Sequence, residues 1–131
     1  SIKGIRAARR NVKPGRRIRS AVAFEDGIPD HGGYKRLLDK AKTPDDLLGL
    51  VYELGYKELD QWQVQIQAMI QQKTDVYIYS DGLSDEEIRE SLFIPCRDIT
   101  LTIDLIAKRY GTGFSIAVLP EGPQTVPVLV N

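Results

Sequence analysis

Segments that suit β-strands alternate along this chain with segments long enough to form whole helices, and this alternation constrains the fold more than any other feature. The expected strands are Ile18–Phe24, Val76–Tyr79 and Phe114–Leu119. Strands separated by helices cannot pair as hairpins, so they require right-handed crossovers and a parallel sheet. The sequence therefore predicts a single α/β domain over residues 1–131, a Rossmann-like three-layer domain with a mainly parallel sheet flanked by helices.

Several segments carry the start and stop signals of helices. Thr43-Pro44-Asp45-Asp46 places a capping hydroxyl, a proline and two acids at the beginning of one of them. Ser84 with Glu87 three residues later is a capping box, and Asp98 precedes a segment that ends in basic residues and Gly111. The expected helices cover residues 2–11, 31–41, 44–54, 61–73, 85–91 and 99–110.

The stretch WQVQIQAMI, residues 62–70, matches both a strand and a helix. Apolar and polar residues alternate over most of it, and as a strand it would form a hairpin with Val76–Tyr79. The glutamines are better helix formers than strand formers, Asp60 can cap the first turn, and the stretch contains no Gly or Pro. The interpretation is a helix. Its apolar stripe consists of Trp62, Ile66, Met69 and Ile70.

A second stretch, ITLTIDLI at residues 99–106, also alternates. The cap at Asp98 and the stop at Gly111 again favour a helix. Its expected apolar stripe is Ile99, Ile103, Ile106 and Tyr110.

Composition narrows the class of protein. No apolar run is long enough to cross a membrane and no signal peptide is recognisable, so the chain is expected to be soluble and cytoplasmic. The single cysteine, Cys96, cannot form an internal disulfide and is interpreted as a small buried hydrophobe. The single histidine, His31, lies beside two glycines and is interpreted as a loop residue rather than a catalyst.

Charge is unevenly distributed although the formal net charge is zero. Eight of the first twenty residues are basic and none is acidic. Such a segment can bind nucleic acid, or it can be a solvated face that docks on an acidic protein surface. No aromatic residue in it could stack on a base, which weakens the nucleic-acid reading.

Each expected strand runs into an acidic residue and a glycine, through Asp26, Asp81 and Glu121. The carboxyl ends of parallel strands meet at one edge, where ligands of such sheets bind. The three acids could hold a divalent cation there, or they could simply form turns, for which Asp and Gly are suited. Acids would repel a phosphate, and no glycine-rich phosphate loop is present. The residues by themselves therefore indicate an α/β domain without an assigned role.

A longer stretch, DQWQVQIQAMIQQKTDVYIYSDGLSDEEIR, adds a resemblance. Together with SIKGIRAA and EDGIPDHGGYKRLL before it and IPCRDI and VLPEGPQTVP after it, it resembles the C-terminal domain of the nickel-dependent lactate racemase family. The resemblance covers essentially the whole chain. It implies a helix at WQVQIQAMI and a two-domain protein with a nickel pincer nucleotide held between the domains. That cofactor passes a hydride to and from lactate or a related 2-hydroxy acid.

The resemblance also implies which residues belong to the site. The catalytic histidines, the nickel ligand and the lysine that anchors the cofactor belong to an N-terminal domain absent from this chain, so no catalytic or metal-binding residue is expected here. Trp62 corresponds to a tryptophan that covers the cofactor, where a flat apolar side chain excludes water. Lys3 corresponds to a cleft lysine near cofactor and substrate, suited to a carboxylate or oxyanion. The alternatives are a core role for Trp62 and simple solvent exposure for Lys3.

One segment departs from the family. The family's first strand here is largely apolar, whereas this chain carries Arg16, Arg17 and Arg19. Arginines in a central strand are costly to bury without partners, so this strand is expected at an edge of the sheet, or the segment is expected to be divergent or disordered.

The function expected on these grounds is that of the C-terminal domain of a lactate racemase-like 2-hydroxy acid racemase or epimerase, which closes over a nickel pincer nucleotide and is inactive alone. Its expected partners are the N-terminal racemase domain, a small 2-hydroxy acid and, through exposed apolar surface, a second copy in a homo-oligomer. The alternative is a stand-alone interaction module whose basic N-terminal segment binds an acidic partner or nucleic acid.

Overall fold

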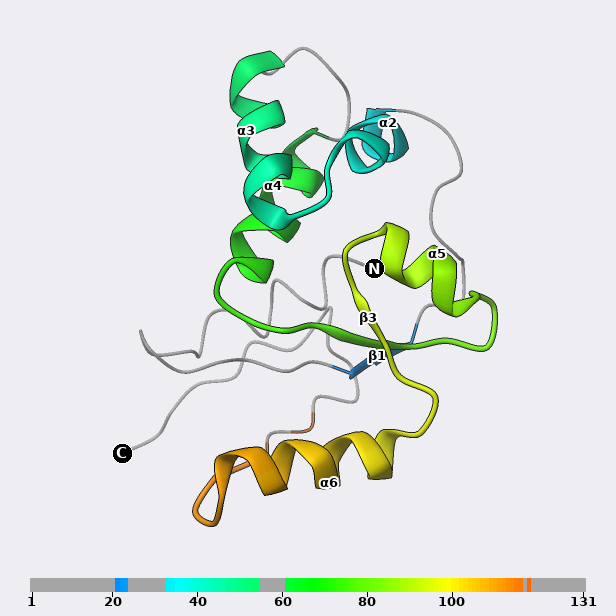
Figure 1. Cartoon of the computed structure of the whole chain (residues 1–131), viewed down its shortest axis with the longest axis vertical. Helices are drawn as coiled ribbons and strands as arrows, with labels where there is room; N and C mark the ends of the chain where they lie inside the picture. Colours follow the sequence, from blue (N-terminus) through cyan, green and yellow to red (C-terminus); the bar gives the residue numbers. More distant parts are fainter. Residues whose placement is uncertain (1–20, 24–32, 55–60, 117, 119–131) are drawn as a thin grey trace.

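The computed structural model of the 131-residue chain describes residues 21–23, 33–54, 61–116 and 118 (Figure 1). The expected helix at residues 2–11 therefore lies outside the described residues, as does most of the first expected strand. The elements, in chain order, are β1 (Ala21–Ala23), α2 (Gly33–Lys40), α3 (Pro44–Leu54), α4 (Gln61–Gln71), β2 (Tyr77–Tyr79), α5 (Asp85–Glu90), β3 (Ile94–Pro95) and α6 (Ile99–Tyr110).

The described strands form one parallel sheet in the order β1-β2-β3. Val22 pairs with Ile78, and Ile78 pairs with Pro95. Helices separate all three strands in sequence, as the parallel crossovers predicted from the sequence require. Within the described sheet β1 is an edge strand, which agrees with the position expected from the arginines that precede it. An α/β fold with a parallel sheet is thus confirmed.

The third strand was predicted in the wrong place. Residues 114–116 and 118 belong to no strand, and the third strand is the two-residue β3. Ile94 N–H donates to the Val76 carbonyl at 3.0 Å, and Cys96 N–H donates to the Ile78 carbonyl at 2.8 Å. Pro95, between them, sits where its missing N–H would point away from β2, so the proline removes no ladder bond. A strand this short has no alternation from which it could be predicted.

The predicted helix caps are confirmed. At the start of α3, Asp46 N–H donates to Thr43 Oγ1 at 3.1 Å. Ser84 and Glu87 form the reciprocal capping box of α5. Leu101 N–H donates to Asp98 Oδ1 at 2.8 Å at the start of α6. That helix ends at Gly111, whose φ of 74° suits a residue without a Cβ.

WQVQIQAMI is helical, as interpreted, because α4 covers Gln61–Gln71. Its amphipathic burial explains the outcome. Val64 and Ala68 are completely buried in the first cluster, and Gln67, next to Ala68, is buried as well, whereas a strand would have placed these two neighbours on opposite faces.

Two apolar clusters form the core. The first joins α2, α3 and α4, and the second joins α4 to the sheet and α5. Only α4, among the described helices, contributes buried residues to both clusters, so it connects them. The first cluster consists of Tyr34, Leu37, Leu38, Ala41, Leu47, Leu48, Val51, Val64 and Ala68. The second consists of Ile70, Val76, Ile78, Leu83, Ile88 and Phe93.

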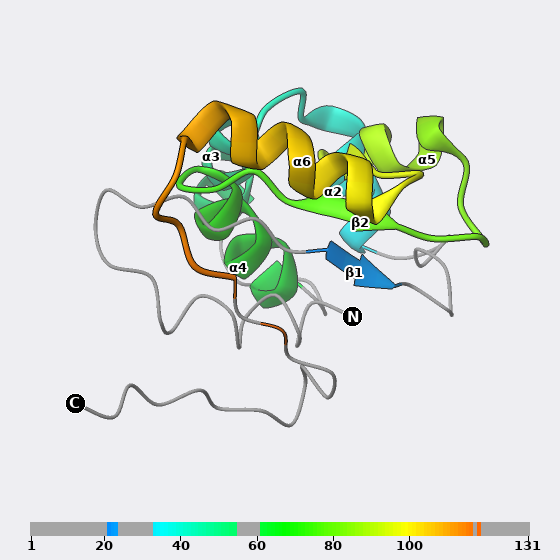
Figure 2. The same cartoon turned by 90° about the horizontal axis from the view of Figure 1, so that it is seen from below.

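Helix α6 lies on the opposite side of the sheet from α2, α3, α4 and α5, as Figures 1 and 2 show from two directions. The prediction that α6 is a helix is confirmed, and none of its residues is buried, so its apolar stripe is not covered within the described part of the chain. Its half-buried residues, Thr102, Ile106 and Ala107, mark the side that faces the protein. Cys96 is buried, as predicted, and its Sγ lies 3.1 Å from Thr102 Oγ1, which links β3 to α6. No described helix is long and apolar enough to cross a membrane.

Candidate functional site

Two of the site residues expected from the sequence are described by the structure, Trp62 and Asp81. Lys3, His31, Asp26 and Glu121 lie outside the described residues, so their assignments stay predictions. The site can therefore be built from α4, which carries Trp62, and from the carboxyl edge of the sheet, where Asp81 follows β2.

Trp62 lies on the outward side of α4 and is 47% exposed. The core interpretation of this residue is thus wrong. On a helix, Ile66 and Met69 fall on the same stripe as Trp62, and both are only partly buried. Met69 packs against the first cluster and Ile66 against the second, so Trp62 is the exposed member of a stripe that otherwise contacts the core. Large exposed aromatic side chains next to other apolar groups are typical of binding surfaces.

A buried polar network fixes α4 against its neighbours. Tyr34 Oη donates to Gln67 Oε1 at 2.5 Å, and Gln67 Nε2 donates to the Ser91 carbonyl at 2.8 Å. One turn later, Gln71 Nε2 donates to the Leu92 carbonyl at 2.6 Å. Burial raises the pKa of Tyr34, and the hydrogen bond to Gln67 offsets only part of this effect. Because buried polar groups are costly to leave unpaired, these bonds specify one register for α4 and hence the position of Trp62.

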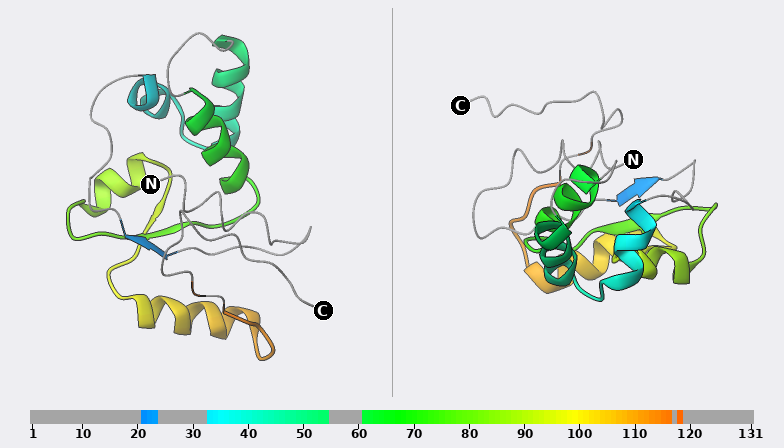
Figure 3. Two further views of the ribbon diagram at one scale, coloured as in Figure 1. Left: turned by 180° about the vertical axis from the view of Figure 1, so that it is seen from behind. Right: turned by 90° about the horizontal axis from the view of Figure 1, so that it is seen from above.

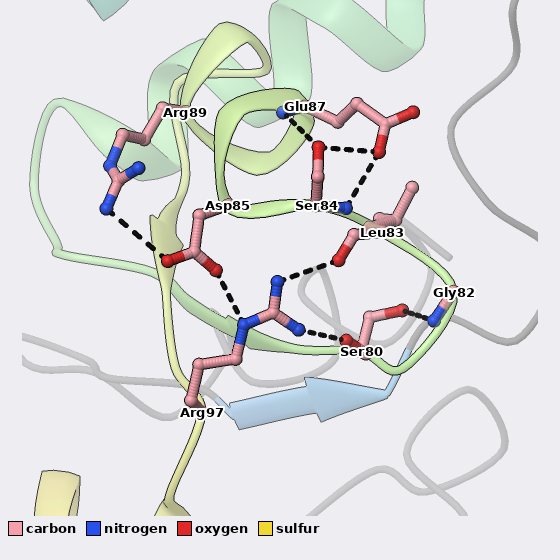
Figure 4. Close-up of polar contacts among 8 residues, drawn as sticks. All are labelled: Ser80, Gly82, Leu83, Ser84, Asp85, Glu87, Arg89 and Arg97. Atoms are coloured by element: carbon pink, nitrogen blue, oxygen red, sulfur yellow. Dashed lines mark hydrogen bonds and ion pairs between the residues drawn. The ribbon is translucent and has the colours of Figure 1, made fainter.

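At the carboxyl edge of the sheet, the side chain of Arg97, which follows β3, contacts the loop between β2 and α5 and the start of α5 (Figure 4). Its Nε donates to Asp85 Oδ1 at 2.6 Å, and its two Nη atoms donate to the carbonyls of Ser80 and Leu83, each at 2.9 Å. The planar guanidinium satisfies three acceptors in three directions. It thereby holds the loop between β2 and α5, including the turn in which Gly82 N–H donates to Ser80 Oγ.

The divalent-cation hypothesis for this edge stays a prediction, because Asp26 and Glu121 lie outside the described residues. The third strand ends at Pro95 and is followed by Cys96 and Arg97 rather than by an acid and a glycine. Asp81 is exposed, and no three His, Cys, Asp or Glu side chains gather as a metal site among the residues that the structure describes. The turn interpretation of Asp81-Gly82 fits the Ser80–Gly82 hydrogen bond.

Comparison with known proteins identifies the family. The sequence profile of the "Lactate racemase C-terminal domain" matches residues 1–130. The chain belongs to this family. Lactate racemase from Thermoanaerobacterium thermosaccharolyticum is 27% identical over 130 residues, which cover 96% of this chain and 30% of that protein. The solved structure of the lactate racemase apoprotein from the same organism is similar with a TM-score of 0.77 at 27% identity, over 100% of this chain and 31% of that one.

The match bears on the hypotheses drawn from the sequence. The resemblance to the lactate racemase C-terminal domain is confirmed. The match begins at the first residue, so the basic N-terminal segment falls within the lactate racemase domain. The comparisons give no support to a stand-alone interaction module. The chain spans less than a third of the length of the racemase that it matches.

Sequence reasoning missed the residues that hold the site in place. Gln67 was interpreted only as a helix former, and neither Gln71 nor Arg97 was singled out. A weak signal was present, because Gln67 lies on a helix between core positions and a polar residue there needs a buried partner. The partners themselves, two backbone carbonyls after α5, could not be read from the sequence.

Proposed function

We propose that this chain is the C-terminal part of a lactate racemase-like enzyme that interconverts the enantiomers of a small 2-hydroxy acid. In this proposal it closes, together with an N-terminal racemase domain, over a nickel pincer nucleotide. We also propose that the helices on both sides of the parallel sheet form a Rossmann-like three-layer domain in the intact protein. The observation that carries the functional proposal is the half-exposed Trp62 on α4, in a chain that belongs to the lactate racemase C-terminal family.

The residues of this chain fit a covering role for the cofactor rather than a metal-binding one. The indole of Trp62 is 47% exposed, and contact of its apolar surface with water is unfavourable. A flat partner that covered the ring would remove this surface from water and so gain free energy. When bound, the nickel pincer nucleotide supplies a pyridinium ring that accepts a hydride and returns it. Trp62 would exclude water from that ring and so limit side reactions with solvent during hydride transfer. The tight packing of α4 would keep the indole in place without reorganisation.

Lys3 would bind the substrate. Its ammonium group carries the charge that a 2-hydroxy acid carboxylate or a developing oxyanion requires, and fixed charges of this kind contribute strongly inside a water-poor site. This role rests on the family resemblance of Ser1-Ile2-Lys3-Gly4.

The proposal is tested in a chimera in which this chain replaces the matching segment of the T. thermosaccharolyticum lactate racemase. After loading with nickel pincer nucleotide, conversion of L-lactate into D-lactate is followed by chiral chromatography. We expect racemisation above the level of the unloaded protein. Trp62→Ala should lower kcat/KM by roughly tenfold or more, and Lys3→Ala by roughly a hundredfold.

The matched control is Tyr52→Ala, which removes another exposed aromatic residue, 66% exposed on the neighbouring helix α3. Its kcat/KM should stay within about twofold, since no role in the site is assigned to it. A folded, loaded chimera that does not racemise lactate or related 2-hydroxy acids would contradict the function. If the chimera is active and Trp62→Ala behaves like Tyr52→Ala, the assignment of Trp62 is wrong.

A further inference from the structure

The chain turns sharply between α5 and β3, and one residue of this turn has an unusual backbone conformation. Among the residues that the structure describes, Leu92 alone of the non-glycine residues has a positive φ, of 63°. This left-handed region favours glycine, because a Cβ crowds the following carbonyl there. A leucine stays in this region only where the surrounding contacts outweigh the strain.

The turn is a Schellman motif with leucine in the position that glycine usually takes. Leu92 N–H donates to the Arg89 carbonyl at 2.9 Å, and Phe93 N–H donates to the Ile88 carbonyl at 3.1 Å. Phe93 and Ile88 are both buried in the second cluster, which is the hydrophobic contact that accompanies this motif. Leu92 packs against the first cluster instead, which accounts for a side chain at this position. We call residues 91–93 the Leu92 corner.

The Leu92 corner presents two carbonyl groups to α4. Gln67 Nε2 donates to the Ser91 carbonyl at 2.8 Å, and Gln71 Nε2 donates to the Leu92 carbonyl at 2.6 Å. The two glutamines are one turn apart and so share one side of α4. The left view of Figure 3 shows α4 (green) and α5 (yellow-green) on the same side of the sheet. These contacts therefore join α4 directly to the segment that enters β3.

The hydrogen bonds allow one orientation of the two amide groups. Gln67 Oε1 accepts from Tyr34 Oη, and Gln67 Nε2 donates to Gln71 Oε1 at 3.2 Å as well as to the Ser91 carbonyl. A flipped Gln67 amide would bring two oxygens together at Ser91, and a flipped Gln71 amide would do the same at Leu92. Rotation of α4 about its axis would break both bonds to the Leu92 corner together. The network thus fixes this rotation.

Rotation of α4 also moves Trp62, because the indole stands outward from the helix axis. Gln67 and Gln71 lie five and nine residues after Trp62, which is about 8 Å and about 14 Å along the helix. At 100° per residue, both lie on the opposite side of the helix from Trp62. The Leu92 corner therefore holds α4 from behind, while the indole points outward and is 47% exposed.

We propose that the Leu92 corner positions Trp62, with Gln71 and Gln67 as the positioning residues that transmit its backbone geometry to α4. The orientation of α4 is independent of any reaction. The kinetic consequence rests on the proposed function. If α4 were free to turn, the indole would cover the cofactor ring less well and the chemical step would slow, while binding of the substrate by Lys3 would remain.

Gln71→Met tests the positioning in the 131-residue chain. Methionine keeps the length of the side chain but cannot donate to the Leu92 carbonyl. Residual dipolar couplings of the backbone amides measure the orientation of α4 relative to β2. We expect Gln71→Met to change the α4 couplings, and to shift or broaden the indole N–H resonance of Trp62, the single tryptophan.

The matched control is Gln72→Met, which removes a neighbouring glutamine whose Nε2 donates to Asp45 Oδ1 at the start of α3 rather than to the Leu92 corner. Its α4 couplings should stay those of the wild type. Unchanged couplings in Gln71→Met, or equal changes in both variants, would overturn the proposal. A lower urea midpoint for Gln71→Met with wild-type couplings would also overturn it, because the bond would then stabilise the fold without positioning α4.

Substitution of Leu92 tests the strained conformation. Leu92→Gly and Leu92→Ala both remove the contact with the first cluster, but only alanine keeps a Cβ in the left-handed region. Leu92→Gly should therefore have the higher urea midpoint, although glycine normally loses more conformational entropy on folding. An equal or higher midpoint for Leu92→Ala would show that the corner does not require this conformation and would contradict the proposal.

The kinetic consequence is measured in the loaded chimera described above. Gln71→Met should lower kcat about three- to tenfold and leave KM for L-lactate within about twofold, and Gln72→Met should change neither. An unchanged kcat for Gln71→Met in a chimera that racemises lactate would disprove the kinetic role. The couplings need neither nickel nor lactate. Inactivity of the chimera without these substitutions would therefore count against the proposed function alone, and the couplings would still decide whether the Leu92 corner positions α4.

Discussion

A single side chain, Arg97, holds the loop between β2 and α5 at the edge of this sheet. Asp85 accepts from two arginines, but the two contacts differ in kind. Arg97 approaches at 2.6 Å from another element and also binds two carbonyls, whereas Arg89 lies one turn along the same helix at 3.6 Å. Exposed pairs within one helix contribute little, while a guanidinium that also donates to two backbone carbonyls makes charge-assisted hydrogen bonds that fix the loop.

Arg97→Lys should therefore lower the free energy of unfolding by about 1–2 kcal/mol, because lysine keeps the charge but cannot donate in three fixed directions. The estimate is modest because half of the Arg97 side chain is exposed. Arg89→Lys is the control, with an expected change within about 0.5 kcal/mol. Urea unfolding measures both, and equal losses in the two variants would show that the carbonyl contacts of Arg97 contribute nothing.

Among the described elements, α4 connects the largest number of other parts of the structure. It contributes to both apolar clusters, presents Trp62 outward, and is tied to α2 and to the segment after α5 through Gln67. The bond from Tyr34 to Gln67 connects α2 to α4, two helices that α3 separates in the sequence. Its removal leaves a buried carbonyl oxygen without its donor, which costs more than the net value of a hydrogen bond.

Tyr34→Phe should thus lower the free energy of unfolding by about 1–3 kcal/mol near neutral pH. Burial raises the pKa of Tyr34 in the folded state, so the stability linked to its proton is complete below the ordinary tyrosine pKa of about 10. It is lost as the pH rises above that value, because the unfolded chain releases the proton first. In Tyr34→Phe, which has no hydroxyl to titrate, the free energy of unfolding should fall less steeply as the pH rises above about 10.

Urea unfolding at pH 7, 10 and 11 measures the effect of Tyr34→Phe. Tyr52→Phe, which removes a hydroxyl from an exposed ring, serves as the control and should keep the alkaline slope of the wild type. A Tyr34→Phe variant with an unchanged slope would contradict the role given to burial.

At the scale of the whole molecule, the two clusters should unfold together, because α4 belongs to both. The chain contains two natural probes at different places, one on α4 and one at the sheet. Its single tryptophan, Trp62, lies on the helix that joins the clusters, and its single cysteine, Cys96, is buried after β3 at the sheet. Their unfolding transitions therefore report on different parts of the same molecule.

Leu47→Ala tests this cooperativity. Leu47 is completely buried in the first cluster, so the substitution should cost about 2–5 kcal/mol. Trp62 fluorescence and the labelling of the Cys96 thiol should give the same reduced free energy of unfolding. If the thiol is protected as strongly in the variant as in the wild type, the sheet unit is stable without the helical unit and the coupling through α4 is absent.

The sequence by itself determined the features that depend on neighbours along the chain. The caps of α3, α5 and α6, the helical state of α4 and the parallel crossovers follow from local hydrogen bonding, propensity and period, and the family follows from the pattern of residues. Tertiary structure decided the rest. It placed the third strand at Ile94–Pro95, which has no period to read, and turned Trp62 outward although it shares a helical stripe with partly buried residues. It also brought Arg97 to Asp85 and Gln67 to Tyr34. These contacts depend on pairing between distant segments, and no local preference encodes which segments meet.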